Sequence, residues 1–189
     1  MTELPNRSVS RRRLLAGAAA GLSVGVAGCS GGENASITPV SLDGKRACDQ
    51  CGMIIEDHPG PVGQIHFEDD EPEGGRPGQF CSSTCTYRYR FDAEAEGRTV
   101  EAAFLTDYSS VEYEVFTEGG DTQFSSHVES EAFERMPALT VVARSEVVGA
   151  MGPELIPFSE EGDVTAFTDE YGGEPMPATD VERSTLEAL

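Results

Sequence analysis

Four cysteines in two short-spaced pairs are the residues best suited to bind a metal ion or to form disulfides. The pairs are Cys48-x2-Cys51 and Cys81-x3-Cys85, with 29 residues between them. Gly52-Met53 follows the first pair, and in an extended segment Cys51 and Met53 would project from the same face. A thiolate and a thioether at neighbouring positions suit a soft metal ion.

Three chemistries compete for these cysteines. Two disulfides are typical of an exported protein, and four cysteines allow three connectivities. Two short-spaced pairs also form a four-thiolate signature for structural zinc. The third possibility is Cu(I), which prefers thiolate and thioether ligands, and Met53 favours it because zinc gains little from a thioether. His66 could add an imidazole, although its alternation with Gln64 and Glu68 is typical of a solvent-facing side chain.

Short strands and a capped helix are predicted to position these sulfur atoms. Strands are expected at 54–55, 64–67, 78–80, 99–107 and 111–117, and Ser82 can cap a helix that begins beside Cys81. A second half repeats the order, with strands at 139–143, 155–158 and 176–181 and a helix capped by Asp163 and closed by Gly172-Gly173. The prediction is an α+β fold of two small ββαβ units.

The first residues have the features of an export signal. Arg11 and Arg12 precede a 13-residue apolar run from Leu14 to Val26, which is too short to span a bilayer and fits a secretory signal. The paired arginines resemble a Tat signal, and the run ends in Val26-Ala27-Gly28-Cys29, which resembles a lipobox. We therefore expect Tat export and a lipid on Cys29 that anchors the protein to the outer face of the cytoplasmic membrane. The alternative is an ordinary signal peptide with an unmodified Cys29.

The predicted organisation has four parts. Residues 1–28 are the twin-arginine lipoprotein signal peptide, and 29–45 are the lipidated cysteine and a flexible linker. Residues 46–107 are the first ββαβ unit with the Cys-Gly-Met site, and 108–189 are the second.

The charge of the chain limits its partners. It has 34 acidic and 13 basic residues and a formal net charge of −21. Nucleic-acid binding is not expected, because phosphates require a basic surface. An acidic surface of this kind also suits a halophilic source, where salt screens the self-repulsion. No nucleophile elbow, phosphate-binding glycine loop or HExxH motif is present, so no enzyme activity is predicted.

Several sequence landmarks in order resemble the NosL family. The segment Cys48-Asp49-Gln50-Cys51-Gly52-Met53 is similar to the family's opening motif, and Phe80-Cys81-Ser82-Ser83 is similar to its next landmark. The third landmark is the segment 149–153, followed by Pro157-Phe158 and by Phe167-x3-Tyr171-Gly172-Gly173. NosL proteins are copper-binding lipoproteins that assist nitrous-oxide reductase.

The resemblance implies a lipid-anchored Cu(I) chaperone that serves apo nitrous-oxide reductase and its membrane assembly complex in denitrification. It assigns candidate sulfur ligands at Cys51, Met53, Cys81 and Met151, with His66 as a further candidate. Cys85 departs from the family pattern, in which one cysteine at the second landmark is usual. It could form a disulfide with Cys48, or complete a zinc site of Cys48, Cys51, Cys81 and Cys85.

Two rival functions remain open at the level of sequence. One is a membrane-tethered interaction module with structural zinc or two disulfides. The other is a thiol–disulfide enzyme that uses Cys48-x2-Cys51, although no thioredoxin-like βαβ pattern surrounds this pair.

Overall fold

Helices and sheets share the described part of the chain, which is residues 37–68, 72 and 74–189 of a computed structural model. The predicted α+β class is confirmed. The expected signal peptide, with Arg11, Arg12 and the lipidation candidate Cys29, lies outside these residues. Within the described segments, no helix has both the length and the apolar character needed to cross a bilayer.

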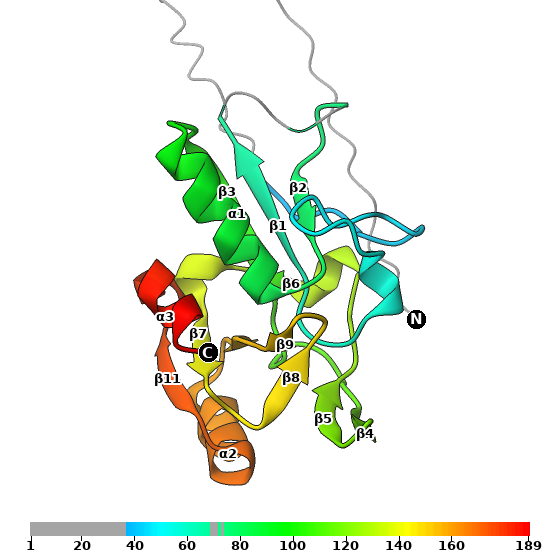
Figure 1. Ribbon diagram of the computed structural model, residues 1–189, viewed down its shortest axis with the longest axis vertical. Helices are drawn as coiled ribbons and strands as arrows, with labels where there is room; N and C mark the ends of the chain where they lie inside the picture. Colours follow the sequence, from blue (N-terminus) through cyan, green and yellow to red (C-terminus); the bar gives the residue numbers. More distant parts are fainter. Residues whose placement is uncertain (1–36, 69–71, 73) are drawn as a thin grey trace, which may run out of the picture. The chain divides into compact units, whose positions relative to one another are not determined.

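The first unit is built on an antiparallel sheet with the strand order β2-β1-β3-β6. Its elements are β1 (Gly63–Phe67), β2 (Gly78–Phe80), α1 (Ser83–Ala95), β3 (Val100–Thr106) and β6 (Phe133–Arg135). Helix α1 contacts β1, β2 and β3 and lies alongside them in Figure 1. Gly63 of β1 is paired with Phe80 of β2, so Cys81 directly follows the paired end of this hairpin.

Gly63 lies where α1 packs closely on β1. A methyl group at this position would lie against the Thr86 hydroxyl, 2.9 Å from Leu105 Cδ2 and 3.1 Å from the Phe104 carbonyl oxygen. The carbonyl belongs to the sheet backbone and Leu105 is buried, so neither can move away freely. We expect Gly63→Ala to lower the free energy of unfolding by about 1–3 kcal/mol in urea denaturation.

The matched control for this prediction is Gly162→Ala in the second helix. A methyl group there meets no atom within 4 Å, so the substitution should be neutral or slightly stabilising. Equal losses of stability in the two variants would contradict the close approach at Gly63.

The second unit repeats the topology of the first. Its elements are β7 (Thr140–Ala143), β10 (Ile156–Phe158), α2 (Glu161–Tyr171) and β11 (Glu174–Pro177). Their order in the sheet is β10-β7-β11, so the first strand is again central and the strand after the helix lies on its other side. Pro157 lies on an edge strand, where a residue without an N–H is tolerated. Helix α2 begins after Glu160, one turn earlier than the expected cap at Asp163, and it ends at Gly172 as predicted.

A third sheet, with the order β4-β5-β8-β9, was not anticipated as a separate element. It combines β4 (Val115–Glu118), β5 (Asp121–Phe124), β8 (Val147–Gly149) and β9 (Gly152–Pro153). The strand expected at 111–117 therefore begins later, at Val115. The β8–β9 hairpin is an insertion between β7 and β10, and Met151 lies in its turn.

Short helical segments complete the described residues. They are the 3-10 turns η1 (Ile55–Asp57), η2 (Ser130–Ala132), η3 (Met136–Ala138) and η4 (Ala178–Asp180), together with α3 (Arg183–Glu187). The strand expected at 54–55 is reduced to a single bridge between Ile54 and Ala47, because the chain turns into η1 at Ile55.

The end of the predicted linker packs onto the folded unit. Leu42 is fully buried, and its N–H donates to the Val128 carbonyl at 2.7 Å. Gln64 of β1 exchanges two hydrogen bonds with the backbone of Val40, at 2.9 and 3.0 Å. The expectation of a flexible linker up to residue 45 is therefore wrong for this stretch. Pro39 and Gly44 suggested a linker, but apolar contacts and backbone pairing fix the chain.

Candidate metal centre

The first cysteine pair lies in a tight turn. The Gly52 N–H donates to the Cys48 carbonyl and the Cys48 N–H donates to the Met53 carbonyl, both at 2.8 Å. Gly52 has a φ of 79°, a conformation that glycine adopts without steric cost. The chain turns at Gly52 and is not extended between Cys51 and Met53. The expectation that these two side chains project from the same face of an extended segment is therefore wrong.

The second cysteine pair lies at the beginning of α1. Cys81 follows β2, and Ser82 caps the helix by accepting the Cys85 N–H at 2.9 Å, as predicted. The Cys81 sulfur lies 3.9 Å from that of Cys85, which is in the first turn of α1. Cys81 precedes the extended cap residue Ser82, so the contact joins the end of β2 to the first turn of the helix.

The two pairs meet in one cluster of four thiols, which we call the four-cysteine cluster: Cys48, Cys51, Cys81 and Cys85. Their Sγ atoms all lie within 4.8 Å of one another, and those of Cys51 and Cys81 are 3.4 Å apart. Zinc with four thiolates at about 2.3 Å would place the sulfurs about 3.8 Å apart, so a single ion of this size fits the observed spacing. None of the four described cysteines forms a disulfide.

Burial distinguishes one cysteine from the other three. Cys48, Cys81 and Cys85 are at most 3% exposed and belong to the larger hydrophobic core, to which both units contribute. Cys51 is exposed. Three of the four ligand residues are therefore shielded from solvent, and the cluster is accessible to solvent at Cys51.

Hydrogen bonds among the buried thiols shift their pKa values in opposite directions. Hydrogen bonds from Cys81 and Cys85 hold the pKa of the Cys48 thiol far below its usual range. The hydrogen bond to Cys48 raises the pKa of Cys81 well above that range and the pKa of Cys85 to about 12. The raised pKa values of Cys81 and Cys85 mean that these thiols keep their protons at neutral pH. A metal ion must displace those protons to bind.

Met53 and Met151, the two candidate thioether ligands, differ in burial. Met53 is partly buried and packs against the core that contains Cys48, Cys81 and Cys85. Met151 is 38% exposed, while Ala150 beside it packs against the same core.

Among the described residues, His66 does not join the four-cysteine cluster. It lies on β1 beyond the paired segment of the β1–β2 hairpin, and its ring contacts Phe104 edge to face at a centroid distance of 5.9 Å. The expected solvent-facing alternation holds at Glu68, which is exposed, but fails at Gln64. Gln64 is fully buried and His66 partly buried, because the segment around Val40 covers Gln64.

A buried carboxylate that no sequence pattern marked joins the β8–β9 hairpin to the helix with the cysteines. Oε1 of Glu154 accepts the Thr84 N–H and the Thr84 hydroxyl, both at 2.8 Å, and the Leu155 N–H at 2.9 Å. Glu154 is 1% exposed, and burial raises its pKa to about 7. Thr84 lies in the first turn of α1, between Cys81 and Cys85. The end of the β8–β9 hairpin is therefore fixed to the first turn of α1, which carries Cys85.

The NosL family model matches residues 39–186, which include all four clustered cysteines and Glu154. The chain belongs to the NosL family. A curated NosL relative, the copper-binding lipoprotein from Stutzerimonas stutzeri, is 27% identical over 168 residues, covering 88% of this chain and 78% of that protein. The crystal structure of the copper chaperone NosL from Shewanella denitrificans has the same fold, with a TM-score of 0.60 and 23% identity. The match covers 76% of this chain and 95% of that one. These NosL proteins are named for binding or carrying copper, and neither name describes an enzyme.

Proposed function

We propose that this NosL protein binds Cu(I) in the four-cysteine cluster and transfers it to a partner outside the cell. The observation that carries the proposal is the meeting of four thiols within 4.8 Å, on a chain whose relative is named a copper-binding lipoprotein. Thiolates are soft ligands that select Cu(I) over harder cations. Cu(I) also accepts two or three sulfur ligands, so it does not need all four thiols at once.

The unequal burial of the thiols supports transfer as well as binding. Cys48, Cys81 and Cys85 would retain the ion within the core, while Cys51 lies at the surface. An incoming thiolate or thioether can approach the metal from the Cys51 side and replace that ligand first. The ion would then pass to the partner without being released into solution.

The remaining parts of the proposal are its location and its partner. The paired arginines Arg11 and Arg12 and the lipobox-like segment ending at Cys29 support Tat export and lipid anchoring to the outer face of the cytoplasmic membrane. The S. stutzeri relative is named a lipoprotein, which agrees with such an anchor. Resemblance to the NosL family supports apo nitrous-oxide reductase and its membrane assembly complex as the recipient of the copper.

Structural zinc is the second candidate, because a set of four cysteine thiolates is a usual ligand set of such zinc ions. A structural site is closed, and its four ligands are retained throughout the life of the protein. The exposure of Cys51 favours exchange and therefore Cu(I).

Metal analysis of the full chain purified without oxygen tests the proposal. We expect about one Cu(I) per chain after loading with an excess of Cu(I) and Zn2+, with sulfur ligands in X-ray absorption at the copper edge. The variant Cys29→Ser keeps all four clustered thiols and should bind the same amount. One tightly held zinc that Cu(I) does not displace would overturn the copper proposal in favour of structural zinc. Absence of any bound metal would overturn both.

A further inference from the structure

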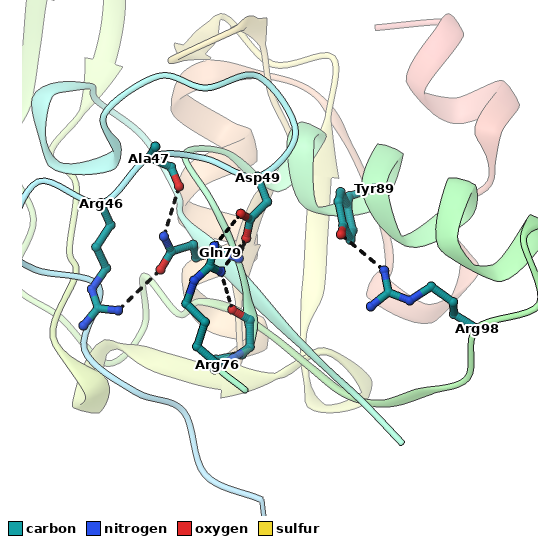
Figure 2. Close-up of polar contacts among 8 residues, drawn as sticks. Arg46, Ala47, Asp49, Arg76, Gln79, Tyr89 and Arg98 are labelled. Atoms are coloured by element: carbon teal, nitrogen blue, oxygen red, sulfur yellow. Dashed lines mark hydrogen bonds and ion pairs between the residues drawn. The ribbon is translucent and has the colours of Figure 1, made fainter. Parts of the chain in front are cut away.

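An ion pair joins Asp49, in the turn that contains Cys51, to Arg76, two residues before β2 (Figure 2). Asp49 lies between the cysteines of the first pair, and both of its carboxylate oxygens bind the Arg76 guanidinium. Nη1 donates to Oδ2 and Nη2 to Oδ1, each at 2.7 Å. The two side chains are 19% and 32% exposed, and Arg76 also donates to the Pro77 carbonyl at 2.9 Å. Two-pronged charge-assisted contacts of this kind are strong and fix orientation as well as distance.

Backbone contacts of Asp49 reinforce the same junction. Its N–H donates to the Gln79 carbonyl at 2.9 Å, and the Gln79 N–H donates to Asp49 Oδ2 at 2.8 Å. The Gln79 side chain donates to the Ala47 carbonyl at 3.0 Å and accepts from Arg46 at 3.5 Å. Gln79 belongs to β2 and is two residues before Cys81. The turn is thus aligned with the end of β2 mainly through the Asp49 carboxylate and the Gln79 amide groups.

The hydrogen bonds inside the turn cannot set this alignment. The bonds between Cys48 and Gly52 and between Cys48 and Met53 close the turn on itself. They make no connection to Cys81. Cys51 is exposed, so packing does not hold its side chain as it holds the three buried thiols. The 3.4 Å distance between Cys51 Sγ and Cys81 Sγ therefore depends on what joins the turn to its surroundings, which is the buried Cys48 on one side and the contacts of Asp49 on the other.

We propose that the Asp49–Arg76 ion pair is a latch that positions Cys51 against Cys81 and so limits how fast the cluster releases its metal ion. The proposal rests on the copper-binding function above and deepens it. Asp49 and Arg76 are positioning residues, since they act on the ion through Cys51. With the latch intact, Cys51 returns to the metal faster than a competing ligand captures it. Without the latch, the turn moves away and leaves an open coordination position.

Release of Cu(I) to an excess of a Cu(I)-specific chelator tests the latch. We expect Arg76→Ala and Asp49→Asn each to raise the release rate at least ten-fold. The double variant should be about as fast as the faster single variant, because both substitutions break the same ion pair. Arg76→Lys should fall in between, since an ammonium is a point charge that cannot bind both carboxylate oxygens in the same fork. X-ray absorption should show fewer sulfur neighbours around copper in Arg76→Ala than in the wild type.

Two comparisons separate positioning from a general loss of stability. Arg144→Ala breaks the exposed ion pair between Arg144 and Glu174 in the second unit and should leave the release rate unchanged. Circular dichroism shows whether each variant is folded, and Asp49→Asn and Arg76→Lys change the site least. Folded latch variants with wild-type release rates and sulfur counts would overturn the proposal.

A measurement on the metal-free protein distinguishes failure of the latch from failure of the copper function. A mild oxidant should cross-link Cys51 to Cys81 readily in the wild type and at least several-fold more slowly in Arg76→Ala, because the two thiols no longer lie side by side. If the wild type binds no Cu(I), the copper function fails. Equal cross-linking rates in the wild type and the variant would overturn the latch in either case.

Discussion

Replacement of Cys81 by serine is expected to weaken Cu(I) binding by about a thousand-fold or more, equivalent to about 4 kcal/mol of binding free energy. Cys81 is fully buried, and its sulfur lies 3.4 Å from that of Cys51 and 3.9 Å from that of Cys85. Serine has nearly the same shape, but its hydroxyl is a hard ligand that Cu(I) does not favour. The loss should therefore arise from ligand chemistry and not from altered packing.

Competition with a chelator of known Cu(I) affinity measures this effect. Cys51→Ser is the informative companion, because it removes a thiol at the rim of the same cluster. We expect it to weaken binding less than Cys81→Ser, since three buried thiols remain, and to speed the transfer of Cu(I) to a thiol acceptor, since the coordination position at the surface is already open. Wild-type affinity in Cys81→Ser would mean that copper binds away from the four-cysteine cluster.

The second large effect concerns Glu154 and the pH dependence of stability. Burial raises the pKa of Glu154 from its usual 4.5 to about 7 in the folded protein. Between these values the folded protein keeps a proton that the unfolded chain has lost, so folding is favoured at acidic pH. The free energy of unfolding should therefore fall by about 3 kcal/mol as the pH rises from about 4.5 to about 7, and this contribution should level off above that.

Glu154→Gln removes this titration while an amide oxygen can still accept from Thr84 and Leu155. Urea denaturation of the metal-free protein at about pH 5 and about pH 7.5 should show a smaller loss of stability in the variant than in the wild type. Glu146→Gln replaces an exposed carboxylate and should retain the wild-type difference between the two pH values. Equal pH dependence in Glu154→Gln and the wild type would mean that Glu154 ionises in the folded protein as it does in water.

Local patterns predicted much of the fold. The helix caps at Ser82, before α1, and at Gly172, after α2, were predicted correctly. Caps and left-handed turns can be predicted because they depend on the residue at one position. The strands around 64–67, 78–80 and 139–143 were marked by their apolar and β-branched residues. The β4-β5-β8-β9 sheet was not predicted because its strands have only two to four residues and because the pairing of β5 with β8, which joins its two local hairpins, connects distant parts of the chain. The packing of Leu42 was not predicted either, because its hydrogen-bond partner Val128 is distant in the sequence.

The sequence by itself determined which ligands this protein offers and which family it resembles. The position of Cys81 and Cys85 on either side of the Ser82 cap predicted that this pair meets at the start of the helix. Only the tertiary structure decided that the two cysteine pairs meet and that Cys51 alone remains exposed. It also decided that Glu154 and the Asp49–Arg76 pair support the site. The physical reason is that these contacts join segments about 30 to 70 residues apart, whose approach depends on strand register and burial over the whole unit and not on any local pattern.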